Sequence, residues 1–139
     1  MSKKIVNAIA ITLLLCILLP VTAYAAPKAS KYISSYDGGC RWNGSNVEVR
    51  FDISTKRVVD QLGVSSIYLY ESTDLSTWTL VKSFYPSSYP NMMAYNTFSM
   101  GSYVSYTNAV SGRHYKATIN YIVISGSDTE YRTLYTPYI

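Results

Sequence analysis

Histidine, cysteine and carboxylate side chains supply most enzymatic nucleophiles and general acids or bases, and this chain has few of them. It contains one histidine, His114, two cysteines and eight acidic residues in 139 residues. His114 follows Arg113 and has no Asp, Glu, Ser or Cys at a motif spacing, so no nucleophile–base pair can be assembled from the sequence. We therefore expect no enzyme activity.

Metal and nucleic-acid sites also lack their usual components. One imidazole and scattered carboxylates offer too few ligands for a metal ion. The Lys and Arg residues are dispersed and do not form the basic run that is typical of nucleic-acid binding. We expect no metal, no cofactor and no nucleic-acid partner.

Tyrosine is the unusual residue, with 15 copies in the chain. Exposed tyrosine rings are rigid and amphipathic, and they can stack on sugars or anchor a protein partner. Tyrosine is also favourable on any half-exposed strand surface, which is the simpler explanation. The candidate ligand-binding residues fall on the outer phase of strands or in loops: Tyr68, Tyr70, Tyr85, Tyr89, Met92, Met93 and Tyr95.

These candidates are expected to form one surface. Tyr68 and Tyr70 precede a short turn at Asp74, and the returning strand leads into the loop that holds the others. Strands joined by a short turn are neighbours in a sheet, so their outer aromatic side chains would be contiguous. The adjacent methionines would add an adaptable apolar contact, although a loop folded back over a strand edge would have the same composition.

Residues 1–25 have the three zones of a secretory signal peptide. Lys3 and Lys4 supply the positive start, an apolar run follows, and Ala23-Tyr24-Ala25 provides the small residues that signal peptidase requires. An uncleaved membrane anchor fits less well, because the apolar run is shorter than the roughly 20 residues that span a bilayer. We predict cleavage after Ala25 and a secreted, extracellular protein with no membrane association.

Cleavage would leave a single cysteine. Bulky residues precede Cys16 and more apolar chain follows it, so we do not expect a lipid anchor there. Cys40 is then unpaired, and no intrachain disulfide can form. This thiol could be buried, react or join two chains; we favour burial and a monomer, with a Cys40-linked dimer as the alternative. Residues 26–139 suffice for one domain.

The pattern of 46–54 is the clearest sign of β-structure near the start of this domain. Apolar and charged residues alternate there with a period of two, which is typical of a half-buried strand. One face carries Val47, Val49, Phe51 and Ile53, and the other carries Glu48, Arg50 and Asp52. We expect the three charged side chains to form a solvated ladder on the outer surface.

Similar patterns predict further strands along the chain. They cover 32–36, 67–70, 77–85, 99–107 and 115–123, with a short extension at 40–43. A tight turn at 125–128 should lead into a last strand at 129–136. Residues 55–64 carry the only short helical pattern and are expected to form one helical turn in a crossover, while 91–97 should be a loop or an irregular edge.

About seven strands at near-regular spacing favour an antiparallel β-sandwich. At Tyr115-Lys116-Ala117-Thr118-Ile119 the chain resembles the penultimate strand of immunoglobulin and fibronectin type III domains, and Gly112 leads into it. The resemblance implies that the Tyr115 hydroxyl bonds back to the preceding connection and that Trp78 caps the core. Cys40 has no partner for the inter-sheet disulfide of antibody domains.

A second resemblance covers most of 26–139. The segments IYLYESTDLSTWTLVKSF and YPNMMAYNTFS are similar to a family of small secreted proteins of Gram-positive gut bacteria whose function is unassigned. This likeness implies the fold and export. It implies no activity, ligand or catalytic residue.

Together these features favour a secreted, non-catalytic binding module. Its partner would be a carbohydrate or a surface protein recognised through exposed aromatic side chains. The alternative is a structural or self-associating extracellular protein that uses strand edges or Cys40.

Overall fold

Strand β2 is the longest element and organises the fold. The computed structural model describes residues 29–139, so the predicted signal peptide, 1–25, lies outside the described residues. β2 (Asn46–Ser72) continues for 27 residues. Its first part, 46–54, pairs with β1 (Ile33–Asn43) on one side and with β4 (Met93–Tyr106) on the other.

The second part of β2 has different neighbours. Residues 61–72 pair with β5 (His114–Ser125), and 67–71 also pair with β3 (Thr79–Phe84). β6 (Asp128–Tyr135) pairs with β5, and the short 3-10 helix η1 (Pro90–Met92) lies between β3 and β4.

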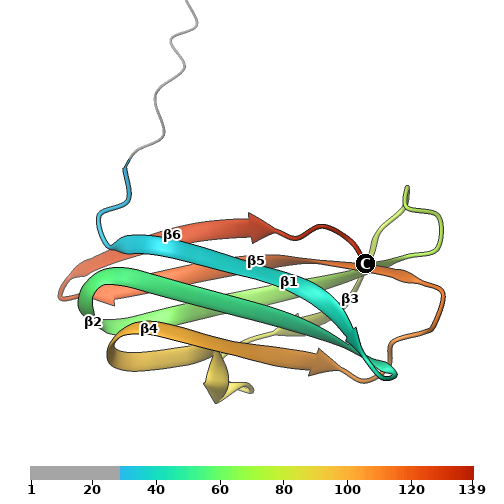
Figure 1. The fold of residues 1–139 in the computed structure, drawn as a ribbon, viewed down its shortest axis with the longest axis horizontal. Helices are drawn as coiled ribbons and strands as arrows, with labels where there is room; N and C mark the ends of the chain where they lie inside the picture. The colour runs from blue at the N-terminus through green and yellow to red at the C-terminus, as the bar shows by residue number, and fades with distance from the viewer. Residues whose placement is uncertain (1–28) are drawn as a thin grey trace, which may run out of the picture.

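The six strands of residues 29–139 form one antiparallel sheet, which curls so that β1 comes to lie near β5 and β6 (Figure 1). We call β1, the first part of β2 and β4 the first limb of this sheet. The second limb consists of β6, β5, the second part of β2 and β3.

The core fills the inner side of the curl. In the first limb, the apolar side chains predicted to share one face of 46–54 are all buried, which confirms that strand. In the second limb, Ile67 and Leu69 of β2 pack with alternate residues of β5. The fully buried rings of Tyr115 and Tyr121 belong to this cluster. Each large side chain removed from water stabilises the fold by roughly 1.5–3 kcal/mol.

The helical turn predicted at 55–64 is wrong, because β2 continues through it. The pairing register shifts between Ser54 and Val59 and again between Val64 and Ser66. Such bulges bend a strand and increase its twist, so β2 passes from one limb to the other without a break. The near-helical spacing of apolar residues in 55–64 therefore belongs to a bent strand.

This bend also changes the number of strands. The stretches predicted separately at 46–54 and 67–70 belong to one strand, and those at 32–36 and 40–43 merge into β1. Six strands result in the part of the chain that the structure describes. Residues 91–97 were predicted to form a loop or an irregular edge, and most of them belong to a strand at an edge of the sheet. After η1, β4 begins at Met93, because the backbone there pairs with residues 59–63 of β2.

The charge ladder predicted on 46–54 is wrong at Glu48, which is only 3% exposed. Arg41 lies opposite Glu48 on β1, and its Nε donates a 2.8 Å hydrogen bond to the carboxylate. Asn43 donates a second hydrogen bond from Nδ2. Hydrogen bonds from Asn43 and then Arg41 hold the pKa of Glu48 below its ordinary value of 4.5. Two neighbours on β1 therefore satisfy a charge that alternation alone places in solvent.

Candidate functional site

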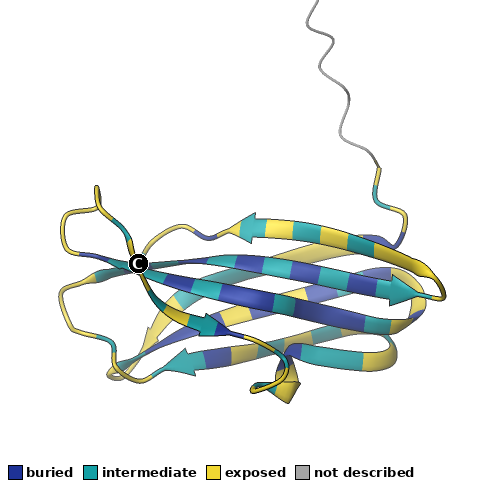
Figure 2. Ribbon diagram, turned by 180° about the vertical axis from the view of Figure 1, so that it is seen from behind, coloured by how far each residue is buried: buried dark blue, intermediate teal, exposed yellow. Residues whose placement is uncertain are grey.

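The outer side of the second limb is an aromatic surface that spans several strands. In an antiparallel pair, residues directly opposite each other project to the same face. Ile119, Tyr121 and Val123 of β5 point into the core, so the alternate residues of β5 and their partners point outward. Figure 2 shows β5 as alternating buried and intermediate residues and β6 mainly as alternating exposed and intermediate residues.

The register places tyrosines from two strands on this outer side. On β6, Tyr135 lies opposite Thr118, and Tyr131 lies opposite Ile122. On β2, Tyr68 lies opposite the same Thr118, so one row crosses three strands. We call the following residues the aromatic face: Tyr68, Tyr70, Trp78, Tyr85, Tyr131, Tyr135 and Tyr138.

Several rings of the aromatic face are open to solvent. Tyr135 is 76% exposed and Tyr131 is 61% exposed. The ring of Tyr85 packs edge-on against Tyr68 with 6.3 Å between centroids. The neighbouring hydroxyls perturb each other: Tyr85 lowers the pKa of Tyr68, and Tyr68 raises the pKa of Tyr85. Tyr68 and Tyr85 therefore hold one another in place.

A second aromatic cluster lies near the C-terminus of the chain. The centroid of Trp78 is 6.2 Å from that of Tyr138, which also packs edge-on against His114. Lys116 places Nζ 4.1 Å from the centroid of Trp78, within the range of a cation–π interaction. The Trp78 ring is therefore anchored to β5 from outside the core.

A row of polar side chains crosses the middle of the second limb. Thr133 of β6 donates a 2.8 Å hydrogen bond from Oγ1 to Oδ1 of Asn120 on β5. Asn120 in turn donates from Nδ2 to Oγ of Ser66 on β2, at 2.9 Å. We call Thr133, Asn120 and Ser66 the polar row. It lies two positions along the strands from the tyrosines on either side.

Charge distinguishes the outer sides of the two limbs. At the paired outer positions of β5, β6 and the second part of β2, Lys116 is the only Lys, Arg, Asp or Glu. On the outer side of the first limb, Glu48, Arg50 and Asp52 project from β2, and Arg41 lies beside them. The aromatic face is therefore nearly neutral, whereas the opposite side of the protein is charged.

The predicted binding residues fall into two groups. Tyr68, Tyr70 and Tyr85 are brought together on the outer side of the second limb. By register, Met93 and Tyr95 also project from this side, opposite Gly63 and Gln61 at the start of β4.

The other two predicted binding residues lie elsewhere. Met92 is fully buried in the core, so it cannot belong to an exposed surface. Tyr89 packs edge-on against the buried ring of Phe84, with 5.0 Å between centroids. The loop that holds them folds back onto the core because apolar side chains next to an open strand edge gain from burial.

Of the two residues to which the immunoglobulin resemblance assigns a role, Tyr115 lies as implied and Trp78 does not. The hydroxyl of Tyr115 accepts a 2.8 Å hydrogen bond from the backbone N–H of Val110, in the connection before β5, as the resemblance implies. Trp78 does not cap the core, because it precedes β3 and packs on the outer side of β5. Trp42 instead reaches the Tyr115 ring, edge-on at 5.5 Å.

The most exposed members of the aromatic face, Tyr131 and Tyr135, are not among the residues predicted from the sequence. Tyr131 and Tyr135 are four residues apart in the last strand and therefore share one side of it. The two-residue turn that pairs Ser125 with Asp128 fixes which side this is. The alternation of 129–136, combined with that turn, is a signal that could have found them.

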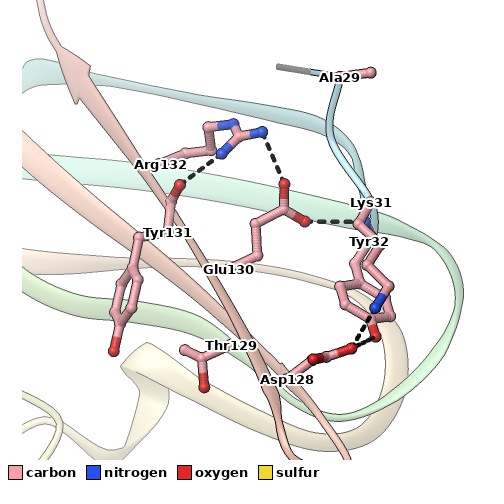
Figure 3. Close-up of a pocket in the computed structure, with 8 residues that line it drawn as sticks. All are labelled: Ala29, Lys31, Tyr32, Asp128, Thr129, Glu130, Tyr131 and Arg132. Atoms are coloured by element: carbon pink, nitrogen blue, oxygen red, sulfur yellow. Dashed lines mark hydrogen bonds and ion pairs between the residues drawn. The ribbon is translucent and has the colours of Figure 1, made fainter.

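A separate polar cluster ties the start of the described chain to β6 (Figure 3). Lys31 and the Tyr32 hydroxyl both bond to the Asp128 carboxylate, and they hold its pKa below its ordinary value. The Glu130 carboxylate accepts the backbone N–H of Tyr32 at 2.9 Å and pairs with Arg132 at 2.7 Å. Because these charged groups pair with one another, the cluster links the segment before β1 to β6.

Cys40 of β1 is half-buried and lies near the residue that follows β6. Its Sγ lies 3.6 Å from Oγ1 of Thr136, and burial raises the pKa of the thiol to about 11. It is therefore protonated at neutral pH, and the thiolate needed for reaction is scarce.

The described residues contain neither a candidate metal site nor a membrane-spanning helix. No three His, Cys, Asp or Glu side chains among 29–139 are grouped closely enough to hold a metal ion. Over the same range no helix is long and apolar enough to cross a membrane.

Comparison with known proteins yields no relative. No family model matches the chain, and neither the curated proteins nor the solved structures include a significant match.

Proposed function

We propose that the protein is a secreted, non-catalytic binding module whose binding surface is the aromatic face. One observation carries this proposal: exposed tyrosines from separate parts of the chain gather on one nearly neutral side of the sheet. Large exposed aromatic surfaces are costly to leave in water and commonly mark interaction sites. Tyrosine loses little side-chain freedom on binding, since it has two rotatable bonds.

We further propose that the curled sheet is an immunoglobulin-like sandwich. The pairing order supports this, because β1, β2 and β4 are neighbours in one limb and β6, β5, β2 and β3 in the other. The hydrogen bond from Val110 to the Tyr115 hydroxyl also supports it, since a corner tyrosine of this kind recurs in such domains. Secretion rests on the charged, apolar and small-residue zones of 1–25.

Binding by two tyrosine variants tests the proposed function. Residues 26–139 would be applied to an array of glycans and to immobilised cell-surface proteins. We expect binding that Tyr131→Ala combined with Tyr135→Ala weakens strongly. Tyr103→Ala is the matched control, because Tyr103 is 50% exposed but lies opposite Arg50 on the outer side of the first limb. Equal loss in the control, or no loss in the double variant, would refute the aromatic face as the site.

Self-association is the second candidate. Its supporting observation is the free outer edge of β6, which pairs with β5 on one side only among the described residues. Mass measurement at two concentrations under reducing conditions separates the two candidates. A concentration-dependent dimer would favour association between copies, and a persistent monomer would favour a separate ligand.

A further inference from the structure

We propose that the aromatic face binds a neutral polysaccharide, with sugar rings stacked on Tyr131 and Tyr135 and sugar hydroxyls bonded to the polar row between them. This inference rests on the proposed function and specifies its ligand class. It follows from three features of the second limb, namely its hydrogen-bonding groups, its ring spacing and its lack of charge.

The polar row is already ordered for ligand binding. Its internal hydrogen bonds fix Thr133 and Asn120 side by side, so a ligand need not immobilise them. Each still has unused capacity: the Asn120 amide has a second N–H, and the Thr133 oxygen can accept. A sugar hydroxyl both donates and accepts, so it matches a surface that offers both kinds of group.

The spacing of the exposed rings indicates an extended ligand. Tyr131 and Tyr135 are four residues apart on β6, which corresponds to roughly 13 Å along a strand. Thr133 lies between them on the same side, opposite Asn120. A single sugar ring cannot contact both tyrosines, whereas a chain of several sugars can.

The charge of the surface selects among polymers. An anionic polysaccharide or a nucleic acid requires several basic groups. At the paired outer positions of β5, β6 and the second part of β2, the only such group is Lys116, and its Nζ already lies over the Trp78 ring. Protein interfaces commonly place Arg beside their aromatic anchors, and those positions carry no Arg. A neutral ligand with apolar ring faces and hydroxyl edges fits this chemistry best.

Native electrophoresis in polysaccharide-containing gels tests the proposal. Reduced protein, residues 26–139, would be run in gels containing hydroxyethylcellulose, galactomannan, xyloglucan or the anionic polymer polygalacturonate. We expect retardation in at least one neutral gel and none in polygalacturonate. Soluble oligosaccharides of the retarding polymer should compete, and its monosaccharide should not.

Three variants and a control locate the site. Tyr131→Ala and Tyr135→Ala should each weaken retardation about tenfold, as expected for a ring that carries much of the binding energy. Thr133→Val keeps the side-chain shape and should weaken it by removing the hydroxyl alone. Tyr103→Ala should retain full retardation. Because the two β6 tyrosines are mostly exposed, their variants should keep the wild-type melting temperature.

Other results would overturn the proposal. No retardation in any neutral gel, or retardation that survives both β6 variants, contradicts a polysaccharide site on this face. If neutral gels fail while capture by surface proteins or dimerisation depends on Tyr131 and Tyr135, the ligand class is wrong and the aromatic face stands as an interaction site. If no interaction depends on these tyrosines, the proposed function fails as well.

Discussion

Removing the hydroxyl of Tyr115 tests how β5 is joined to the connection that precedes it. In Tyr115→Phe the fully buried ring stays in place, so no cavity forms. Two hydrogen bonds are lost. The hydroxyl no longer accepts from the Val110 N–H at 2.8 Å, and it no longer donates to Oε2 of Glu71 at 2.5 Å.

The contacts give the size of the effect. A neutral hydrogen bond contributes about 1 kcal/mol and one to a charged group about 1.5–3 kcal/mol. The two groups that lose the Tyr115 hydroxyl keep other interactions, which reduces the cost. Val110 is 43% exposed to water, and Glu71 keeps its ion pair with Arg113. We therefore expect the free energy of unfolding to fall by about 2 kcal/mol. For a domain of this size the melting temperature should fall by roughly 8 °C.

Urea unfolding of the reduced protein, followed by tryptophan fluorescence, measures this difference. Tyr106→Phe is the control, because the Tyr106 ring packs against Tyr115 at 6.3 Å and its hydroxyl makes no side-chain hydrogen bond among the described residues. It should change stability by less than about 0.5 kcal/mol. Equal effects of the two substitutions would refute a special role for the Tyr115 hydroxyl.

Three further predictions concern the bend, the buried carboxylate and the thiol. Gly63→Ala should lower stability by more than about 3 kcal/mol in thermal unfolding, because the added Cβ would lie 2.2 Å from the Met92 carbonyl oxygen. The control Gly39→Ala should be nearly neutral, because a Cβ there meets nothing within 4 Å. Similar melting temperatures of the two variants would contradict this prediction. Because the pKa of Glu48 is depressed in the folded protein, its ionised carboxylate contributes to folding stability above pH 4.5, and this contribution is lost as pH falls through the folded-state pKa. The urea midpoint should therefore decline less steeply in acid for Glu48→Gln than for the wild type. Parallel declines would contradict this prediction. With a pKa of about 11, Cys40 should react with iodoacetamide near pH 8 far more slowly in the folded protein than in urea, and equal rates would show an open thiol.

The sequence predicts the strands well where their pattern is local. Alternation at 46–54 and 115–123 identifies both the strands and their buried sides, because each side chain's environment follows from its own position in the pleat. The bend of β2 is different. It depends on pairing with β4 more than thirty residues later, which no window of 55–64 contains. Gly63 is the one local sign of that pairing in 55–64, because Met92 and Met93 approach it too closely for a side chain.

The candidate site divides in the same way. Tyr68 and Tyr85 could be placed together because a short turn joins their strands. Placing the side chains of Tyr131 and Tyr135 on the outer side requires the register between β5 and β6, which the turn at 125–128 indicates. The burial of Met92 could not be foreseen, since it depends on how η1 packs against β2 and β4.

Fluorine NMR of the 3-fluorotyrosine-labelled protein tests most directly whether the aromatic face is the binding surface. Resonances would be assigned with single Tyr→Phe variants and followed during titration with the polymer that retards the protein most strongly. We predict that the signals of Tyr131 and Tyr135 shift and broaden, while that of Tyr103, on the outer side of the first limb, stays unchanged. A shift at Tyr103 with unchanged signals from the two β6 tyrosines would contradict the account.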